Sequence, residues 1–251
     1  MSKKVWITGA SSGIGKALAI KFAMEGWQVA ASARRENLLK DLNNQNPNIH
    51  PFPLDVKNET ETKNIFQNII EKFKTIDISV FCTGIHDPDA EKKLSSEKIR
   101  EIMETNFFGT LNCIMAVNTF FREKKSGHIS IVSSVAGYRG LPAASGYCAS
   151  KAALTSLAES LYFDFKRHNV RVSLVSPGFI KTPMTDKNRF PMPMIKSPEF
   201  AAEKMFIGLT KKNAFEIHFP IAFTLMMKLL KIMPNWLYFL LVKKGMKTIK
   251  Y

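Results

Sequence analysis

The sequence has few cysteines and lacks a long uninterrupted apolar run. Its 251 residues include only Cys82, Cys113 and Cys148, an odd number without the C-x-x-C spacing of metal or redox pairs. The basic start MSKK is followed by VWITGA, an apolar run too short for the core of a secretory signal. These absences exclude a disulfide framework and predict a cytoplasmic protein without a metal site.

Acidic residues are also scarce, and none follows Glu216. The 36 Lys and Arg residues against 21 Asp and Glu residues give a net charge of +15 at pH 7. In nucleic-acid-binding proteins such an excess is clustered on one face or along one helix, whereas here it is scattered over most of the chain. The final segment holds the densest group, Lys228, Lys231, Lys243, Lys244, Lys247 and Lys250. We therefore expect no nucleic-acid partner.

Apolar runs of strand length alternate with helix-length segments along the chain. The strand-like runs are KVWITG, WQVAASA, IHPFPLDV, ISVFCTG, GHISIVSS, VRVSLVSPG and FEIHFP. Between them, apolar residues recur at helical spacing, as in 16–26, 61–73, 99–125 and 149–168. The alternation predicts a single α/β domain, a doubly wound, Rossmann-like parallel sheet with helices on both faces. We place this domain at 1–218 and an apolar, basic helical extension at 219–251.

Three glycines crowd the turn TGASSGIG that follows the first strand-like run. In a doubly wound fold this turn lies at the carboxyl edge of the sheet, where the next helix aims its N-terminal amides at a ligand. Gly9 permits the sharp turn, Gly13 lets a pyrophosphate approach the backbone, and Gly15 lets the helix pack on the strand. The remaining residues of this predicted cofactor-binding turn are Ser11, Ser12 and Ile14. A plain tight turn, the alternative, would need only one or two glycines.

The second strand-like run ends in AASARREN, where the adenosine ribose of a dinucleotide would lie. Ala33 stands where an aspartate would favour NAD, and Arg34 and Arg35 can pair with a 2′-phosphate through charge-assisted hydrogen bonds. We therefore predict NADP(H) as the cofactor. Two solvated arginines at a loop edge are the alternative interpretation.

Polar residues with a chemical use gather around YCASK. Tyr147 and Lys151 are four residues apart at the start of a predicted helix, so an ammonium group lies near a phenol. A free tyrosine, with a pKa of about 10, is a poor acid–base group at neutral pH, and a nearby cation favours its ionised form. Ser134 ends a strand at the same edge, and Asn106 is a polar residue in an apolar helix. Each alone is commonly structural, but together, behind the glycine turn, they predict an active site.

In these motifs the chain resembles the short-chain dehydrogenase/reductase family over most of its length. The matches are TGASSGIG at 8–15, LDV at 54–56, NFFG at 106–109, SS at 133–134, YCASK at 147–151 and SPGFIKTPM at 176–184. The resemblance implies a hydride-transferring oxidoreductase with Tyr147 as the proton donor and Ser134 orienting the carbonyl. It also implies that Lys151 holds the nicotinamide ribose and lowers the pKa of Tyr147, and that Asn106 supports a water-linked proton relay.

The resemblance further implies which residues contact the cofactor. Asp55 and Val56 are expected on the adenine side and Gly84 along its backbone. Bordering the nicotinamide end are Asn106, Tyr147, Lys151, Pro177, Gly178, Ile180 and Thr182. One position departs from the pattern, because Cys82 stands where the family usually has an asparagine that braces the strand. We expect altered local hydrogen bonding there and treat Cys82 as a small buried residue, not a redox group.

The predicted function is the NADP(H)-dependent interconversion of a carbonyl and an alcohol in a small molecule. The stretch 182–200, with four prolines, is expected to form a loop or lid. Its apolar residues, which point to an apolar or lipid-like substrate, are Met184, Phe190, Met192, Met194 and Ile195. Two other classes stay open: a non-catalytic NADP-binding sensor, which would not need Ser134, Tyr147 and Lys151 together, and a membrane-attached interaction protein.

Residues 219–247 are too apolar for an ordinary exposed tail. Pro234, Lys228 and Lys231 interrupt the segment before it reaches the ~20 apolar residues that span a bilayer. One interpretation is a cap over the substrate pocket and a dimer surface. The other is peripheral contact with the inner face of a membrane, in which aromatic residues such as Trp236 lie at headgroup level and lysines face anionic lipid.

The resemblance also implies a homo-oligomer, a dimer or tetramer, assembled through the long helices near 99–122 and 149–167. Both segments carry more apolar residues than one core-facing stripe requires. The aromatic and aliphatic residues in excess are Phe107, Phe108, Phe120, Phe121, Leu161, Tyr162, Phe163 and Phe165.

Overall fold

A parallel sheet of seven strands forms the centre of the computed structural model, which describes residues 2–188 and 190–246. The strands are β1 (Lys4–Thr8), β2 (Gln28–Ser32), β3 (Ile49–Pro51), β4 (Ile78–Phe81), β5 (Gly127–Val132), β6 (Val170–Pro177) and β7 (Glu216–Phe219). Each lies within one predicted run. β3 is the shortest and lies at the edge of the sheet, where the nitrogens of Pro51 and Pro53 face away from β2, because the alternate residues Phe52 and Leu54 donate to it.

The order across the sheet is β3-β2-β1-β4-β5-β6-β7, with all neighbours parallel. The chain therefore leaves β3 at one edge and returns to β4 beside β1. In such sheets the connections diverge at this reversal, and a ligand can lie above the carboxyl ends of the two strands. The predicted doubly wound fold is confirmed.

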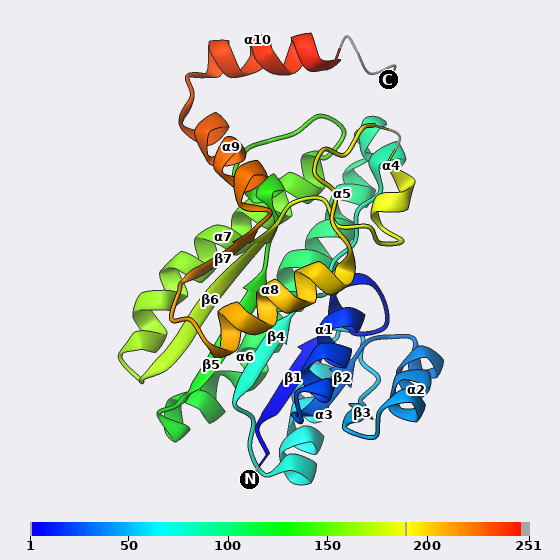
Figure 1. Ribbon diagram of the computed structural model, residues 1–251, viewed down its shortest axis with the longest axis vertical. Helices are drawn as coiled ribbons and strands as arrows, with labels where there is room; N and C mark the ends of the chain where they lie inside the picture. The colour runs from blue at the N-terminus through cyan, green and yellow to red at the C-terminus, as the bar shows by residue number, and fades with distance from the viewer. Residues whose placement is uncertain (1, 189, 247–251) are drawn as a thin grey trace.

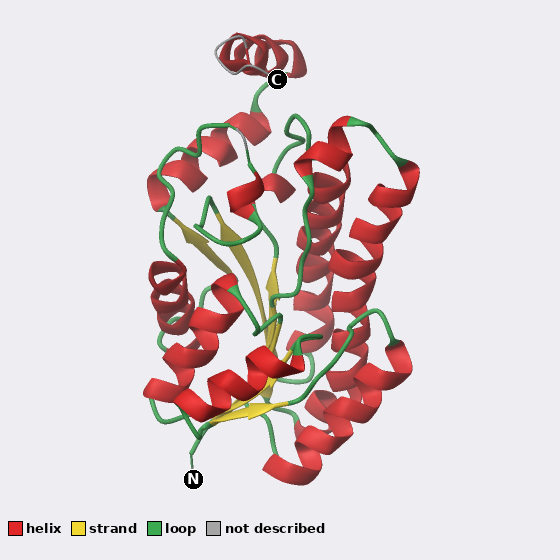
Figure 2. Cartoon of the chain, turned by 90° about the vertical axis from the view of Figure 1, so that its right-hand side faces the viewer, coloured by secondary structure: helices red, strands yellow, loops and turns green. Residues whose placement is uncertain are grey.

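Helices cover both faces of the sheet, as Figure 2 shows edge-on. One face is covered by α1 (Gly13–Met24), α2 (Glu36–Gln45) and α8 (Pro198–Thr210), which bury Phe22, Leu39 and Phe206 against it. On the other face lie α3 (Glu59–Phe73), α6 (Gly109–Lys124) and α7 (Ser145–Lys166). Phe121 and Phe165, predicted for an oligomer surface, are fully buried in this second core. These two rings point from α6 and α7 toward the sheet and pack in the core, so they are not available for an oligomer surface.

The long helix predicted at 99–125 consists of three consecutive elements. A regular helix, α5 (Ser96–Met103), leads into a π-helical turn at Glu104–Phe108, and α6 follows directly. A short helix, α4 (Pro88–Lys92), precedes α5 in the connection after β4. π-Helical turns are rare and frequently mark functional positions, and this one contains Asn106.

Two helices follow the last strand, which ends at Phe219, one residue beyond the predicted domain boundary. They are α9 (Ile221–Ile232) and α10 (Asn235–Met246). In both views α10 lies at one end of the molecule, beyond the rest of the described chain (Figures 1 and 2). None of the described helices is long and apolar enough to cross a membrane.

Candidate active site

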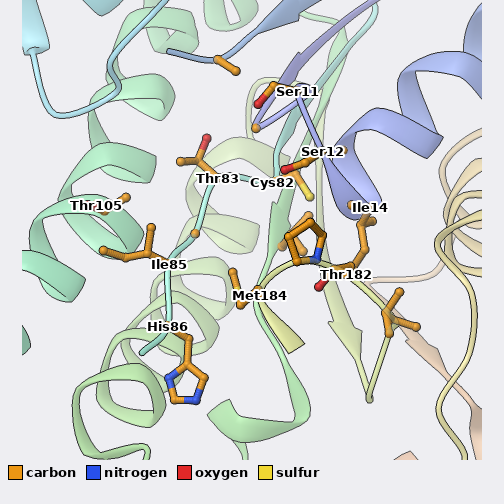
Figure 3. Close-up of a pocket in the computed structure, with 18 of the residues that line it drawn as sticks. Ser11, Ser12, Ile14, Cys82, Thr83, Ile85, His86, Thr105, Thr182 and Met184 are labelled. Carbon is orange, nitrogen blue, oxygen red and sulfur yellow. The ribbon is translucent and has the colours of Figure 1, made fainter. Parts of the chain in front are cut away.

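A cavity of ≈ 440 Å³ opens at the carboxyl edge of the sheet, where β1 and β4 end. Its volume lies within the range of small-molecule and cofactor sites. Figure 3 shows the serines of the glycine turn facing Thr83, Ile85 and Met184 across it. The predicted site residues that line this cavity are Gly9, Ser11, Ser12, Gly13, Ile14, Gly15, Arg34, Arg35, Asp55, Val56, Gly84, Ser134, Tyr147, Lys151, Pro177, Gly178, Ile180 and Thr182. Asn106 does not line it.

The glycine turn is packed as closely as the spacing predicts. Gly9 has φ +71°, and a Cβ there would lie 2.9 Å from the carbonyl oxygen of Cys82. A Cβ on Gly15 would lie only 2.3 Å from the carbonyl oxygen of Gly9. The following helix, α1, has no side-chain cap and no acidic residue in its first turn, so its N-terminal amides remain available for an anion.

Of the two arginines after β2, Arg35 is held in position by hydrogen bonds to the glycine turn. Its guanidinium donates to Ser11 Oγ at 2.9 Å and to Ser12 Oγ at 2.9 Å, bridging the second strand to the glycine turn. Arg34 is exposed and lines the cavity. Both arginines therefore line the cavity beside Ala33, the position at which an aspartate would favour NAD.

Ser134, Tyr147 and Lys151 come together from the end of β5 and the first turns of α7. The Tyr147 phenol lies beside the Ser134 hydroxyl, and its ring centroid is 5.7 Å from Lys151 Nζ. Lys151 Nζ donates to the carbonyl oxygen of Val132 at 2.9 Å. Burial raises the pKa of Tyr147 to about 12, against the opposing influence of the neighbouring Ser134 hydroxyl. The expected lowering of this pKa by Lys151 is therefore not seen, because desolvation of the phenolate dominates.

Lys151 shows the complementary effect. Burial lowers the pKa of its ammonium group to about 8. At neutral pH the chain thus presents a neutral phenol and a largely charged amine side by side, the pairing that a proton donor with a cationic neighbour requires.

Asn106 braces the wall of the site and does not face into it. From the π-helical turn its Oδ1 accepts from the Ile85 amide at 2.7 Å, and its Nδ2 donates to the Ile85 carbonyl and to Ser150 Oγ, both at 3.0 Å. Cys82 directly follows β4, and burial raises the pKa of its thiol to about 11. Asn106 thus supports the connection after β4, and the water-linked relay stays a prediction.

No pattern along the chain singles out His86 and Glu91, which the structure places in the site. The His86 imidazole lines the cavity, with its ring centroid 4.7 Å from that of Tyr147, and its Nδ1 lies 2.8 Å from Glu91 Oε1. The other oxygen of this buried carboxylate accepts from the amides of Gly146 at 2.6 Å and Tyr147 at 3.2 Å. Glu91 is only five residues from His86, but the groups that give the pair its place, Gly146 and Tyr147, are more than fifty residues away.

Only part of the predicted lid reaches the cavity. Met184 lines it, together with Thr185 and Lys187. Phe190 instead packs edge-on against Phe179, with ring centroids 5.9 Å apart. Met194 and Ile195 are exposed, and Met192 accepts a hydrogen bond from Asn188, so these three do not line the cavity.

The fold and this cavity define an α/β protein that binds a nucleotide at the carboxyl edge of its sheet. The model of the short chain dehydrogenase family matches residues 3–192, and the chain belongs to the short-chain dehydrogenase/reductase family of oxidoreductases. An uncharacterized oxidoreductase of Myxococcus xanthus (strain DK1622) is 35% identical over 92% of this chain and 93% of its own length. A 3-oxoacyl-(acyl-carrier-protein) reductase FabG of Thermotoga maritima is 32% identical over 83% of this chain and 91% of its own length.

Solved structures agree with this fold. ElxO with NADP bound is 25% identical, with a TM-score of 0.77 over 87% of this chain and 98% of that chain. A short chain dehydrogenase/reductase from Burkholderia phymatum in complex with NAD is 22% identical, with a TM-score of 0.79 over 91% and 92% of the two chains. Members with this fold thus bind either nicotinamide dinucleotide.

Proposed function

We propose that this oxidoreductase interconverts a carbonyl and an alcohol with NADP(H), using Tyr147 as the general acid and base. The observation that carries the proposal is the convergence of Ser134, Tyr147 and Lys151 on the cavity that the glycine turn opens. A non-catalytic NADP sensor would need the turn and the arginines only, so this convergence favours an enzyme over that alternative.

The cavity fits an anionic dinucleotide. The uncapped N-terminus of α1 and the close-packed turn at Gly9 and Gly15 suit a pyrophosphate. Arg34 and Arg35 at the other end supply two cations within the cavity wall for a 2′-phosphate. These features favour NADP(H) over NAD(H).

The chain's own groups supply the proton chemistry. When bound, NADP(H) donates or accepts the hydride at the substrate carbon. In reduction, Ser134 and Tyr147 donate hydrogen bonds to the carbonyl oxygen, and the Tyr147 phenol passes its proton to that oxygen as negative charge develops there. Lys151, charged below about pH 8, stabilises the resulting phenolate and binds ribose hydroxyls. In oxidation the same proton returns to Tyr147.

The substrate we propose is apolar or lipid-like. Met184 and Ile85 line the cavity near His86 (Figure 3). Behind Gly178 of the cavity wall, the Phe223 ring packs against Phe179. The name of the Thermotoga maritima relative refers to 3-oxoacyl groups, which are carbonyl compounds with acyl chains. We further propose a cytoplasmic homo-oligomer with peripheral contact at the inner face of a membrane.

Purified protein tests the reaction directly. Incubation with NADPH and a panel of aliphatic and acyl ketones should reveal NADPH oxidation, and Tyr147→Phe should abolish it while leaving NADPH affinity within about twofold, because the ring remains and only the proton is lost. Ser134→Ala serves as a second variant that keeps Tyr147. Retention of most activity by Tyr147→Phe on an accepted substrate would contradict the assignment.

A further inference from the structure

The two C-terminal helices carry much of the exposed apolar surface of the described chain. Nine of the sixteen large apolar side chains that are exposed among the described residues lie on them. On α9 these are Ile221, Leu225, Met226, Leu229 and Ile232, and on α10 they are Trp236, Phe239, Leu240 and Leu241. Single apolar residues are ordinary on a protein surface, whereas a contiguous set of this size marks an interaction site.

One face of helix α9 packs against residues next to the active site. Phe223 and Met227 are buried against Val135 and Tyr138, directly after Ser134 in the chain. A Cβ on Gly178 would lie 2.7 Å from the Phe223 ring. Because α9 follows the carboxyl end of β7, its inner face packs behind residues next to the site, such as Gly178, while its outer face stays exposed.

Specific contacts hold the junction between α9 and α10 in place. The Arg139 guanidinium caps the end of α9, and it lies 4.1 Å from the centroid of the Tyr238 ring of α10. Its hydrogen-bond acceptors are the carbonyl oxygens of Leu230 at 2.8 Å, Lys231 at 3.0 Å and Met233 at 2.7 Å, and Asn235 Oδ1 at 2.5 Å. Tyr238 also donates to the carbonyl oxygen of Gly140. The outward position of α10, visible in Figure 1, is therefore built by contacts from the body of the protein.

The charge on this surface has one sign. Lys231 and Lys243 are exposed, and no acidic residue follows Glu216. Lys243 follows Trp236 and Leu240 by seven and three residues, so it lies on the same helix face as they do. Lys228, predicted to face lipid, instead forms an ion pair with Glu216 at 2.5 Å and points toward the domain. Lys247 and Lys250 lie outside the described residues.

We propose that α9 and α10 form an arm that docks on an anionic lipid surface. Aromatic side chains suit the headgroup region, and lysines at the border of an apolar face reach anionic phosphates. A second copy is disfavoured as the occupant, because a two-fold contact would set lysine against lysine with no acidic residue of the arm to pair with either. The arm adjoins the substrate end of the site, so an apolar substrate would enter from the membrane; this last step rests on the proposed function.

Vesicle binding of the full chain tests the arm without any substrate. At low salt we expect co-sedimentation with vesicles of phosphatidylglycerol and phosphatidylcholine, and clearly weaker binding to phosphatidylcholine alone. Phe239→Glu with Leu240→Glu should lower the partition coefficient about tenfold or more. Met24→Glu, at a side chain that is 75% exposed on α1, is the matched control and should leave it unchanged. Lys231→Gln and Lys243→Gln should each lower the partition coefficient about fivefold. The control variants Lys40→Gln and Lys63→Gln should change it little.

Tryptophan fluorescence reports the location of contact. Trp6 and Trp27 are buried and Trp236 is 70% exposed, so a blue shift on vesicle addition that Trp236→Phe removes would place α10 in lipid. Retained NADPH binding checks that each variant is folded. No binding by the unmutated chain, equal binding to neutral vesicles, or binding unchanged in the Glu variants would each overturn the proposal, as would arm variants that alter only the oligomeric mass. Because none of these measurements involves turnover, an inactive protein that binds vesicles would refute the proposed reaction alone.

Discussion

Burial shifts the two titratable groups of the proposed catalytic pair in opposite directions. The Tyr147 pKa rises to about 12 and the Lys151 pKa falls to about 8, because each loses hydration of its charged form. Tyr147 therefore stays protonated through the neutral range, while Lys151 loses its charge as the pH rises through about 8. The proton-donating form of the phenol is the stable one, which suits carbonyl reduction.

At alkaline pH the activity of the enzyme should decrease with the deprotonation of Lys151, and not with that of Tyr147. We expect kcat/KM for NADPH-dependent reduction to fall above about pH 8, since this ratio reports the groups of the free enzyme. A pH profile of the unmutated protein and of Lys151→Arg, which keeps its charge, measures this. A profile of Lys151→Arg with the same alkaline limb would assign that limb to another group.

Replacing each of the two arginines after β2 should change the affinities for NADPH and NADH in a different way. Arg34→Ala should weaken NADPH binding about 10- to 150-fold, the value of a hydrogen bond to a charged group, and leave NADH binding unchanged. Arg35→Ala should weaken both cofactors, because this side chain also holds Ser11 and Ser12 of the glycine turn. Fluorescence titration with both dinucleotides measures the four affinities. Equal affinity of the unmutated protein for NADPH and NADH would refute the role of both.

At the scale of elements, the catalytic helix depends on a residue outside itself. Helix α7 has no side-chain cap from its own N-cap residue, Ala144. Its first amides donate instead to Glu91 of α4, which also accepts from His86 beside the Tyr147 ring. The short α4 thereby fixes both the start of α7 and one side of the tyrosine.

Removing this carboxylate should damage stability and catalysis together. Glu91→Ala leaves buried amides unpaired and should lower the free energy of unfolding by about 1–3 kcal/mol. It should also lower kcat, because Tyr147 loses its fixed position. Urea denaturation and turnover measure the two effects, with Glu97→Ala on the exposed side of α5 as the control. We expect Glu91→Gln to recover part of the stability, since one amide oxygen can still accept from the helix.

At the scale of the whole molecule, apolar surface remains on α6 and α7 after the core has formed. Phe108 in the π-helical turn directly before α6, Met115 on α6 and Phe163 on α7 are exposed, whereas Phe121 and Phe165 are buried in the core. The predicted oligomer surface is thus smaller than the sequence indicates. It lies on helices distinct from α9 and α10.

We expect a dimer or tetramer through this surface. Phe163→Glu places a charge on a side chain that is 68% exposed and should shift the protein toward monomer. Light scattering at micromolar concentration, with Met24→Glu as control, gives the mass. A monomeric mass for the unmutated protein would contradict the prediction.

Local spacing determined much of this protein in advance. The strand–helix alternation predicts the sheet, the glycines at 9, 13 and 15 predict the turn, and the four-residue step from Tyr147 to Lys151 predicts their shared face. These features follow from backbone geometry within a few residues, so they can be recognised without knowing what packs against them.

The tertiary structure decided what depends on distant partners. Glu91 meets Gly146 from 55 residues away, Arg35 reaches Ser11 from 24, and Lys228 turns to Glu216 and not to solvent. Likewise, burial reversed the expected shift of the Tyr147 pKa, because desolvation depends on everything packed around a group. No pattern along the chain records which side chains surround a residue, and it is these surroundings that set the protonation states and the supports of the site.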